Sequence, residues 1–306
     1  MSNLIKFFRF FDFKRLVKNI KYLIKYDLNE KELDIIFKAK DGAIDDCVYE
    51  LEEDKKLLSN LTILDDEQTL SMLSHSKKSF ARFGDGEIAI IRGINCNFQK
   101  YEPKLAEKLL SILEKKREDL FVGLNRSYFH SSFPYSDNNH RFYRLYGTDY
   151  RRFFLKVCDP SNIYLDACCF GGYFRLKSDT DFEVLYERNK SLFRGEKIAI
   201  VAGEGLLNNL QHDVFEYAVD RIIIPSPSKN AFDNYDQIIQ EIKEKVPKDY
   251  IVCLILGQTA TVMAADLTDL GYVAWDIGHL PKDYNAYKNK TLRTKEEMDN
   301  YWKADL

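Results

Sequence analysis

Short apolar segments alternate with amphipathic segments over most of the chain after residue 65. Runs rich in Val and Ile, bounded by Gly, Pro or Asp, predict strands at Glu87 to Ile91, Leu120 to Leu124, Ile163 to Asp166, Lys197 to Ala202, Arg221 to Pro225, Tyr250 to Leu256 and Tyr272 to Asp276. Apolar residues at helical spacing predict helices at Pro103 to Arg117, Asp179 to Phe193, Leu206 to Ala218, Asn234 to Lys245 and Thr259 to Leu270. From Lys197 onward the two kinds of element take turns, which predicts an α/β domain with a mostly parallel sheet covered by helices on both faces.

The first 64 residues follow a different pattern. Residues 1–26 contain seven Lys and Arg residues against the single acid Asp12, interleaved with a Phe-rich apolar set. This predicts an amphipathic helix that can either lie on an anionic membrane or pack on the core of the protein. Residues 27–64 form an acidic connector of helical character, and Asp65 is typical of the cap of a following helix. We therefore predict a helical N-terminal extension over 1–64 and an α/β domain over 65–306.

Composition narrows the classes of protein. The chain has 306 residues, of which 45% are hydrophobic and 30% charged, so it can bury a large core and is not disordered. Its 45 basic and 48 acidic residues give a net charge of -3, which argues against a nucleic-acid partner. The six cysteines lack metal-binding spacing and indicate reduced thiols, so we expect a cytoplasmic protein, with residues 1–26 as a route to the inner face of a membrane.

The stretch from Arg82 to Glu87 carries the most informative chemistry. Asp85 and Glu87 are separated by one glycine and preceded by another, so the backbone can bend to aim both carboxylates at one hard cation such as Mg²⁺ or Mn²⁺. Such a cation keeps positions open for the oxygens of a diphosphate, and Arg82 can add a positive charge for phosphate. A bare D-x-E pattern is common, and a turn with two solvated acids is the structural alternative.

Three further strand ends offer weaker candidates. Gly203 and Glu204 follow a strand and precede a helix, where free backbone amides can receive a phosphate, although a plain turn fits equally well. Thr259 can cap a helix or bind an anion. Asp276 and His279 follow the last strand and can hold a metal, orient a sugar hydroxyl or act as a base, although a His in a turn is often only solvated.

Four blocks in this order resemble the bacterial glycosyltransferases of GT-D type, a family formerly called DUF1792. The resemblance covers about residues 66–287. The blocks are Arg82 to Glu87, Pro227 to Phe232 with Tyr235 and Asp236, Leu256 to Val262, and Gly271-Tyr272 leading to Asp276 through His279.

The resemblance implies a Rossmann-like domain that uses its D-x-E motif and Mn²⁺ or Mg²⁺ to bind a nucleoside-diphosphate sugar. It implies transfer of the sugar to a glycan acceptor, and we expect a UDP-hexose donor and a role in surface polysaccharide or glycoprotein assembly. The D-x-E motif falls on Asp85 and Glu87. Other family positions fall on Lys229, Asn230, Thr259, Asp276 and His279.

The reaction itself assigns roles to the charged candidates. Charge develops on the leaving diphosphate, so the metal, Arg82 or Lys229 and helix N-termini are expected to stabilise it. Asp276 or His279 is expected to accept the proton of the acceptor hydroxyl. Two readings from other classes stay open, namely a nucleotide-dependent oxidoreductase built on Gly203 and Glu204, and a membrane-associated scaffold without catalytic activity built on residues 1–26. The sequence leaves the oligomeric state open.

Overall fold

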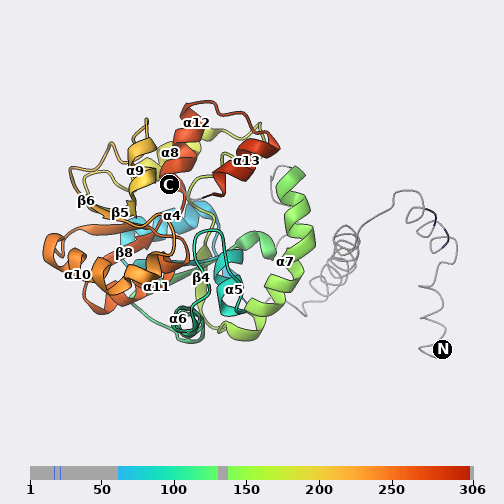
Figure 1. The fold of residues 1–306 in the computed structure, drawn as a ribbon, viewed down its shortest axis with the longest axis horizontal. Coiled ribbons are helices and arrows are strands. Elements are labelled where there is room, and N and C mark those ends of the chain that lie inside the picture. Colours follow the sequence, from blue (N-terminus) through green and yellow to red (C-terminus); the bar gives the residue numbers. More distant parts are fainter. Residues whose placement is uncertain (1–16, 18–20, 22–60, 130–136, 304–306) are drawn as a thin grey trace.

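The computed structural model describes residues 17, 21, 61–129 and 137–303 (Figure 1). The predicted extension over 1–64 therefore lies outside the described residues, except for residues 17, 21 and 61–64. The strands are β1 (Thr62–Ile63), β2 (Ser79–Phe83), β3 (Leu120–Leu124), β4 (Ile163–Asp166), β5 (Lys197–Gly203), β6 (Asp220–Ser226), β7 (Ile251–Ile255) and β8 (Val273–Asp276). The helices are α4 (Asp66–Ser76), α5 (Asp85–Ile91), α6 (Pro103–Glu114), α7 (Asp137–Val157), α8 (Phe182–Ser191), α9 (Glu204–Asn209), α10 (Tyr235–Lys245), α11 (Gln258–Asp269), α12 (Leu280–Lys288) and α13 (Lys295–Tyr301), with short 3₁₀ turns at Arg126–Tyr128 and Ala231–Asn234.

The eight strands form one sheet in the order β1-β4-β3-β2-β8-β7-β5-β6. Every pairing in it is parallel. The predicted fold class is therefore confirmed. The sheet begins at Thr62, because β1 pairs with β4, so the α/β domain starts slightly before the predicted boundary at residue 65.

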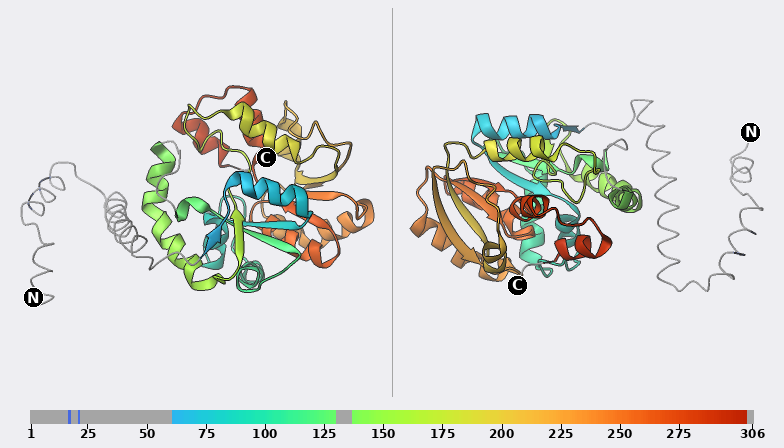
Figure 2. Two further views of the ribbon diagram at one scale, coloured as in Figure 1. Left: turned by 180° about the vertical axis from the view of Figure 1, so that it is seen from behind. Right: turned by 90° about the horizontal axis from the view of Figure 1, so that it is seen from above.

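Alternate residues of each strand supply two cores, one on either face of the sheet. On β5, Ile198 and Ile200 pack with α4, α8 and α12, whereas Ala199 and Val201 pack with α6, α10 and α11. Figure 2 shows α4 and α8 together on one face. Because both faces are covered, the strands are apolar on both sides, which is the pattern that the sequence showed from Lys197 onward.

The centre of the sheet is where the N-terminal and C-terminal halves of the chain meet. β2 pairs with β3 on one side and with β8 on the other, and Phe80 is in register with Trp275. Parallel strands place all of their carboxyl ends at one edge, so the residues after β2 and β8 become neighbours there.

Two predicted elements are wrong. The segment Glu87 to Ile91 belongs to helix α5, and the strand precedes it as β2. The carboxylate of Glu87 accepts a hydrogen bond from the Gly84 amide (2.7 Å), which closes the first turn of a helix rather than extending a strand. The helix predicted over Leu206 to Ala218 ends at Asn209, because two consecutive asparagines, Asn208 and Asn209, favour non-helical backbone.

Several elements were not predicted, among them β2 and the 21-residue helix α7. The predicted helix start at Asp65 is confirmed. Its side chain accepts a hydrogen bond from the amide of Gln68, and the side chain of Gln68 accepts one from the amide of Asp65.

Within the part of the chain that the structure describes, none of the helices combines the length and apolarity that crossing a bilayer requires.

Candidate active site

A cavity of about 910 Å³ opens at the carboxyl edge of the sheet. Residues at or just after the ends of six neighbouring strands line it, together with residues of α7, α12 and α13. The strand-end residues are Phe83 of β2, Asn125 after β3, Ala167 after β4, Gly203 of β5, Leu256 after β7 and Asp276 of β8. This is the position at which an open parallel sheet binds its ligands.

The two acids of the D-x-E motif both line this cavity. Asp85 is exposed to it, whereas Glu87 is buried. Burial raises the pKa of Asp85, and burial followed by the charges of Asp276 and Asp85 raises the pKa of Glu87 to about 7. A divalent cation bound between the two carboxylates would favour their charged forms and so lower both pKa values.

Arg82 lies near the end of β2 and forms an ion pair with Asp276 at the end of β8. Its Nη2 is 2.8 Å from Oδ1 of Asp276, and the two side chains are 19% and 5% exposed. A second hydrogen bond runs from Nη1 to the carbonyl of Ala167 (2.8 Å). Nε of Arg82 has no partner among the described residues. The guanidinium is thus fixed in place at the wall of the cavity.

Asp276 accepts hydrogen bonds mainly on one of its oxygens. Besides Arg82, the amide of Gly278 donates to Oδ1 (3.0 Å), and the hydroxyl of Thr261, which donates to the carbonyl of Arg82 (2.9 Å), lies 3.4 Å from Oδ2. Gly278 has φ +50°, and a Cβ atom there would run into the guanidinium of Arg82. The glycine is therefore required both by its backbone conformation and by the position of Arg82.

His279 lines the same cavity within a cluster of aromatic rings. Its ring centroid is 5.2 Å from that of Phe98, 5.3 Å from Tyr301 and 5.4 Å from Trp302. Burial lowers the pKa of His279 to about 3, and the charges of Lys282, Arg82 and Arg175 lower it in addition. The imidazole is therefore uncharged at neutral pH.

We expect the imidazole resonances of His279 to stay constant between pH 5 and 8, because burial disfavours the charged ring. Proton NMR titration measures this, and comparison with His279→Gln identifies the signal among the five histidines. A folded chain whose His279 pKa lies below 6.5 also loses stability as the pH falls below 6.5, since the unfolded chain then binds the proton more readily. A titration midpoint near 6.5 would contradict the environment described above.

The remaining predicted site residues lie at different distances from the cavity. Gly203 lines it, and a Cβ atom at this position would come 2.8 Å from Cα of Ser228, so close packing of two loops requires the glycine. Glu204 and Lys229 are exposed and are not among the residues that line the cavity. Asn230 has φ 52°, and its Oδ1 accepts from the amide of Lys100 (2.9 Å). It thus anchors the loop that carries Phe98.

Thr259 is fully buried, and its hydroxyl donates to Oε1 of Gln99 (3.2 Å). That hydrogen bond points the side chain into the packing between α11 and the loop around Gln99. The structure thus brings together Arg82, Asp85, Glu87, Gly203, Asp276 and His279 at the cavity, and places Glu204, Lys229, Asn230 and Thr259 around it.

The comparison with protein families decides what kind of domain this is. The model of the family described as "Glycosyltransferase GT-D fold" matches residues 80–305, which include all of the cavity residues named so far. This chain belongs to that family. The expected GT-D resemblance is confirmed, and with it the class of enzyme, a glycosyltransferase.

Known relatives agree with this assignment. The Streptococcus pneumoniae protein "Glycosyltransferase GlyD" is 28% identical over 284 residues, covering 90% of this chain and 30% of that protein. "Probable glycosyl transferase Gly" of Streptococcus gordonii is 28% identical over 238 residues, covering 74% of this chain and 33% of that protein. The GT-D chain thus spans about a third of the length of these curated relatives.

Solved structures share the fold. A domain of unknown function 1792 described as having a distinct glycosyltransferase fold has a TM-score of 0.70 and 32% identity, over 76% of the GT-D chain and 83% of that chain. A glycosyltransferase (DUF1792) from Streptococcus sanguinis has a TM-score of 0.69 and 27% identity, over 75% and 85% of the two chains.

The acids of this GT-D chain suit a cation that keeps open coordination positions. Among the residues that the structure describes, no three His, Cys, Asp or Glu side chains come together as a closed metal site. Mg²⁺ and Mn²⁺ bind through one or two carboxylates and fill their remaining positions with water and substrate phosphate. Asp85 and Glu87 fit this kind of site.

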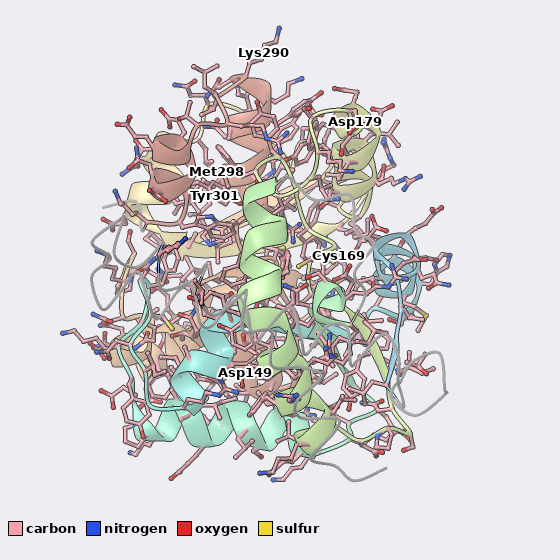
Figure 3. The ribbon with its side chains drawn as sticks, turned by 90° about the vertical axis from the view of Figure 1, so that its right-hand side faces the viewer. Asp149, Cys169, Asp179, Lys290, Met298 and Tyr301 are labelled. Atoms are coloured by element: carbon pink, nitrogen blue, oxygen red, sulfur yellow. The ribbon has the colours of Figure 1, made fainter. Side chains whose placement is uncertain are left out.

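Much of the wall of the GT-D cavity was not predicted. Aromatic side chains of α7 and of the C-terminal helix line it. In the view of Figure 3, Met298 and Tyr301 of the C-terminal helix lie together to the left of the upper part of α7, and Cys169 lies to its right. The unpredicted aromatic lining residues are Phe98, Phe142, Tyr143, Tyr150, Phe170, Tyr301 and Trp302. The chain has 21 Phe and 19 Tyr, so nothing in the sequence marks these among the many aromatics of the core.

Proposed function

We propose that this chain transfers a sugar from a nucleoside-diphosphate donor to a glycan acceptor, with Mn²⁺ or Mg²⁺ held by Asp85 and Glu87. The observation that carries the proposal is the presence of both carboxylates in one cavity at the carboxyl edge of the sheet, beside the buried guanidinium of Arg82. When bound, the cation neutralises the charge of the departing diphosphate.

The protein's own groups supply the rest of the charge stabilisation. Arg82 is held by hydrogen bonds to Asp276 and to the carbonyl of Ala167. The conformational entropy of its side chain is therefore lost on folding, and the donor does not have to order it on binding. Lys229, which is exposed on the loop after β6, stays a predicted contact for the donor.

His279 is the candidate for removing the proton of the acceptor hydroxyl. Asp276 is less available for that role because its carboxylate forms a buried ion pair with Arg82. The pKa of His279 is lowered by burial and by the positive charges of Lys282, Arg82 and Arg175. A bound diphosphate offsets those charges, so the imidazole becomes a stronger base when the donor is present.

The metal and the nucleotide can be tested by thermal unfolding of the purified chain. We expect one nucleoside diphosphate from a panel of UDP, GDP and TDP to raise the melting temperature when Mn²⁺ is present and to have little effect in EDTA. UDP is the expected one. CMP serves as the monophosphate control, and a shift that is equal with and without metal would contradict the proposal.

Donor turnover gives the second arm of the test. Purified protein with Mn²⁺ is incubated with UDP-hexoses, and release of UDP is followed with and without glycan acceptors. Failure to turn over any UDP-, GDP-, TDP- or CMP-sugar would overturn the proposal. Tight binding of NADH without metal would instead favour the oxidoreductase reading of Gly203 and Glu204.

Surface polysaccharide or glycoprotein assembly is the proposed setting. Residues 1–26, which carry the basic Phe-rich pattern, lie outside the described residues apart from 17 and 21, so membrane contact through them stays a prediction. Liposome binding that is lost on deletion of residues 1–26 and unaffected by changes at Asp85 and Glu87 is the expected result. Such attachment would suit an acceptor carried on a lipid.

A further inference from the structure

Gln258, the first residue of α11, lies against the turn that carries the two acids. A Cβ atom built on Gly86 would be 3.1 Å from Cδ of Gln258 and closer still to its amide nitrogen. The middle residue of the D-x-E motif is therefore glycine because the amide of Gln258 occupies the space beside it.

The amide oxygen of Gln258 has no hydrogen-bond partner among the described residues. The residue is 8% exposed and lines the cavity, and its amide oxygen itself is buried. A buried acceptor without a partner is costly, which points to a partner that comes from outside the chain. The oxygen and nitrogen of a side-chain amide can exchange places by a rotation of the amide group. In the rotated form the oxygen of Gln258 would take the position of the nitrogen, which is the amide atom nearer to Gly86.

The surroundings of this oxygen narrow the choice of partner. Asp85 and Glu87 flank Gly86 in the chain and line the same cavity as Gln258, whose side-chain amide lies against Gly86. One oxygen of Glu87 accepts from the Gly84 amide, which leaves its other oxygen for a ligand. Hard divalent cations accept amide carbonyl oxygens alongside carboxylates.

We propose that Oε1 of Gln258 is a third protein ligand of the divalent cation held at the D-x-E motif. This rests on the metal-dependent function proposed above and extends it, since it gives the cation a ligand from α11 as well as two from α5. It also agrees with the glycine at position 86, because a Cβ atom there would overlap the amide of Gln258.

Mn²⁺ binding to the full chain tests this without any assay of transfer. The free Mn²⁺ signal in electron paramagnetic resonance is titrated with wild type, Gln258→Leu, Gln258→Glu and Gln240→Leu. Gln240 is an exposed residue of α10 and gives a matched loss of an amide outside the cavity. We expect the Kd for Mn²⁺ to rise about tenfold or more in Gln258→Leu. It should stay within about threefold of wild type in Gln258→Glu, which retains an oxygen ligand, and should not change in Gln240→Leu.

Thermal unfolding without metal shows whether each variant is folded, and Gln258→Met replaces Gln258→Leu if the latter is not. A Kd in Gln258→Leu within twofold of wild type would overturn the role of Gln258 and leave the proposed function standing. Absence of Mn²⁺ binding by wild type would overturn both. Unchanged Mn²⁺ binding combined with weaker UDP binding in EDTA would show that Gln258 contacts the nucleotide directly, which also overturns the proposal.

Discussion

Replacing Asp85 with asparagine should lower the rate of sugar transfer about 1,000-fold while the chain stays folded. A bound cation contributes several kcal/mol to the stabilisation of the leaving group, and about 4 kcal/mol corresponds to this factor. The carboxylate of Asp85 is exposed to the cavity and accepts hydrogen bonds from the backbone amides of Asp85 and Gly86, so the substitution removes charge and little structure. UDP release from a UDP-hexose with Mn²⁺ measures the effect.

Asp66→Asn is the matched control. Asp66 is the first residue of α4, as Asp85 is of α5, and it is exposed away from the cavity lining. Both substitutions remove an acid from the first turn of a helix, so both should cost at most about 1 kcal/mol of stability. Transfer by Asp85→Asn within threefold of wild type would rule out the cation site on this motif.

Asp276→Leu should lower the free energy of unfolding by about 3–5 kcal/mol, because it leaves the guanidinium of Arg82 buried without its counter-charge. The ion pair is 2.8 Å long and its side chains are only 19% and 5% exposed, so water replaces the lost partner only in part. The amide of Gly278 loses an acceptor as well. Urea unfolding followed by circular dichroism measures the change.

The double variant Arg82→Met with Asp276→Leu should lose less than the sum of the two single variants, because it removes both charges together. Additivity within about 0.5 kcal/mol would show that the pair is not energetically coupled. Asp249→Asn is the control, since Asp249 pairs with Lys197 at 2.9 Å but the side chains are 60% and 46% exposed. Its loss should cost less than about 1 kcal/mol.

The strands β5 and β7 could be predicted from the sequence because they are buried on both faces. The runs Ile198 to Ala202 and Tyr250 to Leu256 are continuously apolar, which is typical of a covered parallel strand. The strand β2 is different. Its sequence, Ser-Phe-Ala-Arg-Phe, contains the site residue Arg82 and so has no clear strand pattern, whereas Glu87 to Ile91 does. A short apolar run fits a strand or a buried helix equally well, and the cap formed by Glu87 decides in favour of the helix.

The candidate site could be predicted only where its chemistry is local. Asp85 and Glu87 are close in sequence, and Asp276 and His279 follow an obvious strand, so both pairs are visible as motifs. Other contacts at the site arise from the order of the strands in the sheet. Examples are the ion pair of Arg82 with Asp276 and the contact of Gln258 with Gly86. These residues are so far apart in the sequence that no motif spacing links them. The position of Lys229 outside the cavity lining likewise depends on the course of the loop after β6.

The central position of β2 has a consequence for synthesis on the ribosome. Ser79 of β2 binds the amide of Ala274 across a separation of 195 residues. A nascent chain that has emerged as far as β4 can assemble β1, β4, β3 and β2, but β2 is then an open edge. The edge stays exposed until the last strand is translated, so this half-built sheet is the stage at which the newborn polypeptide most needs a chaperone.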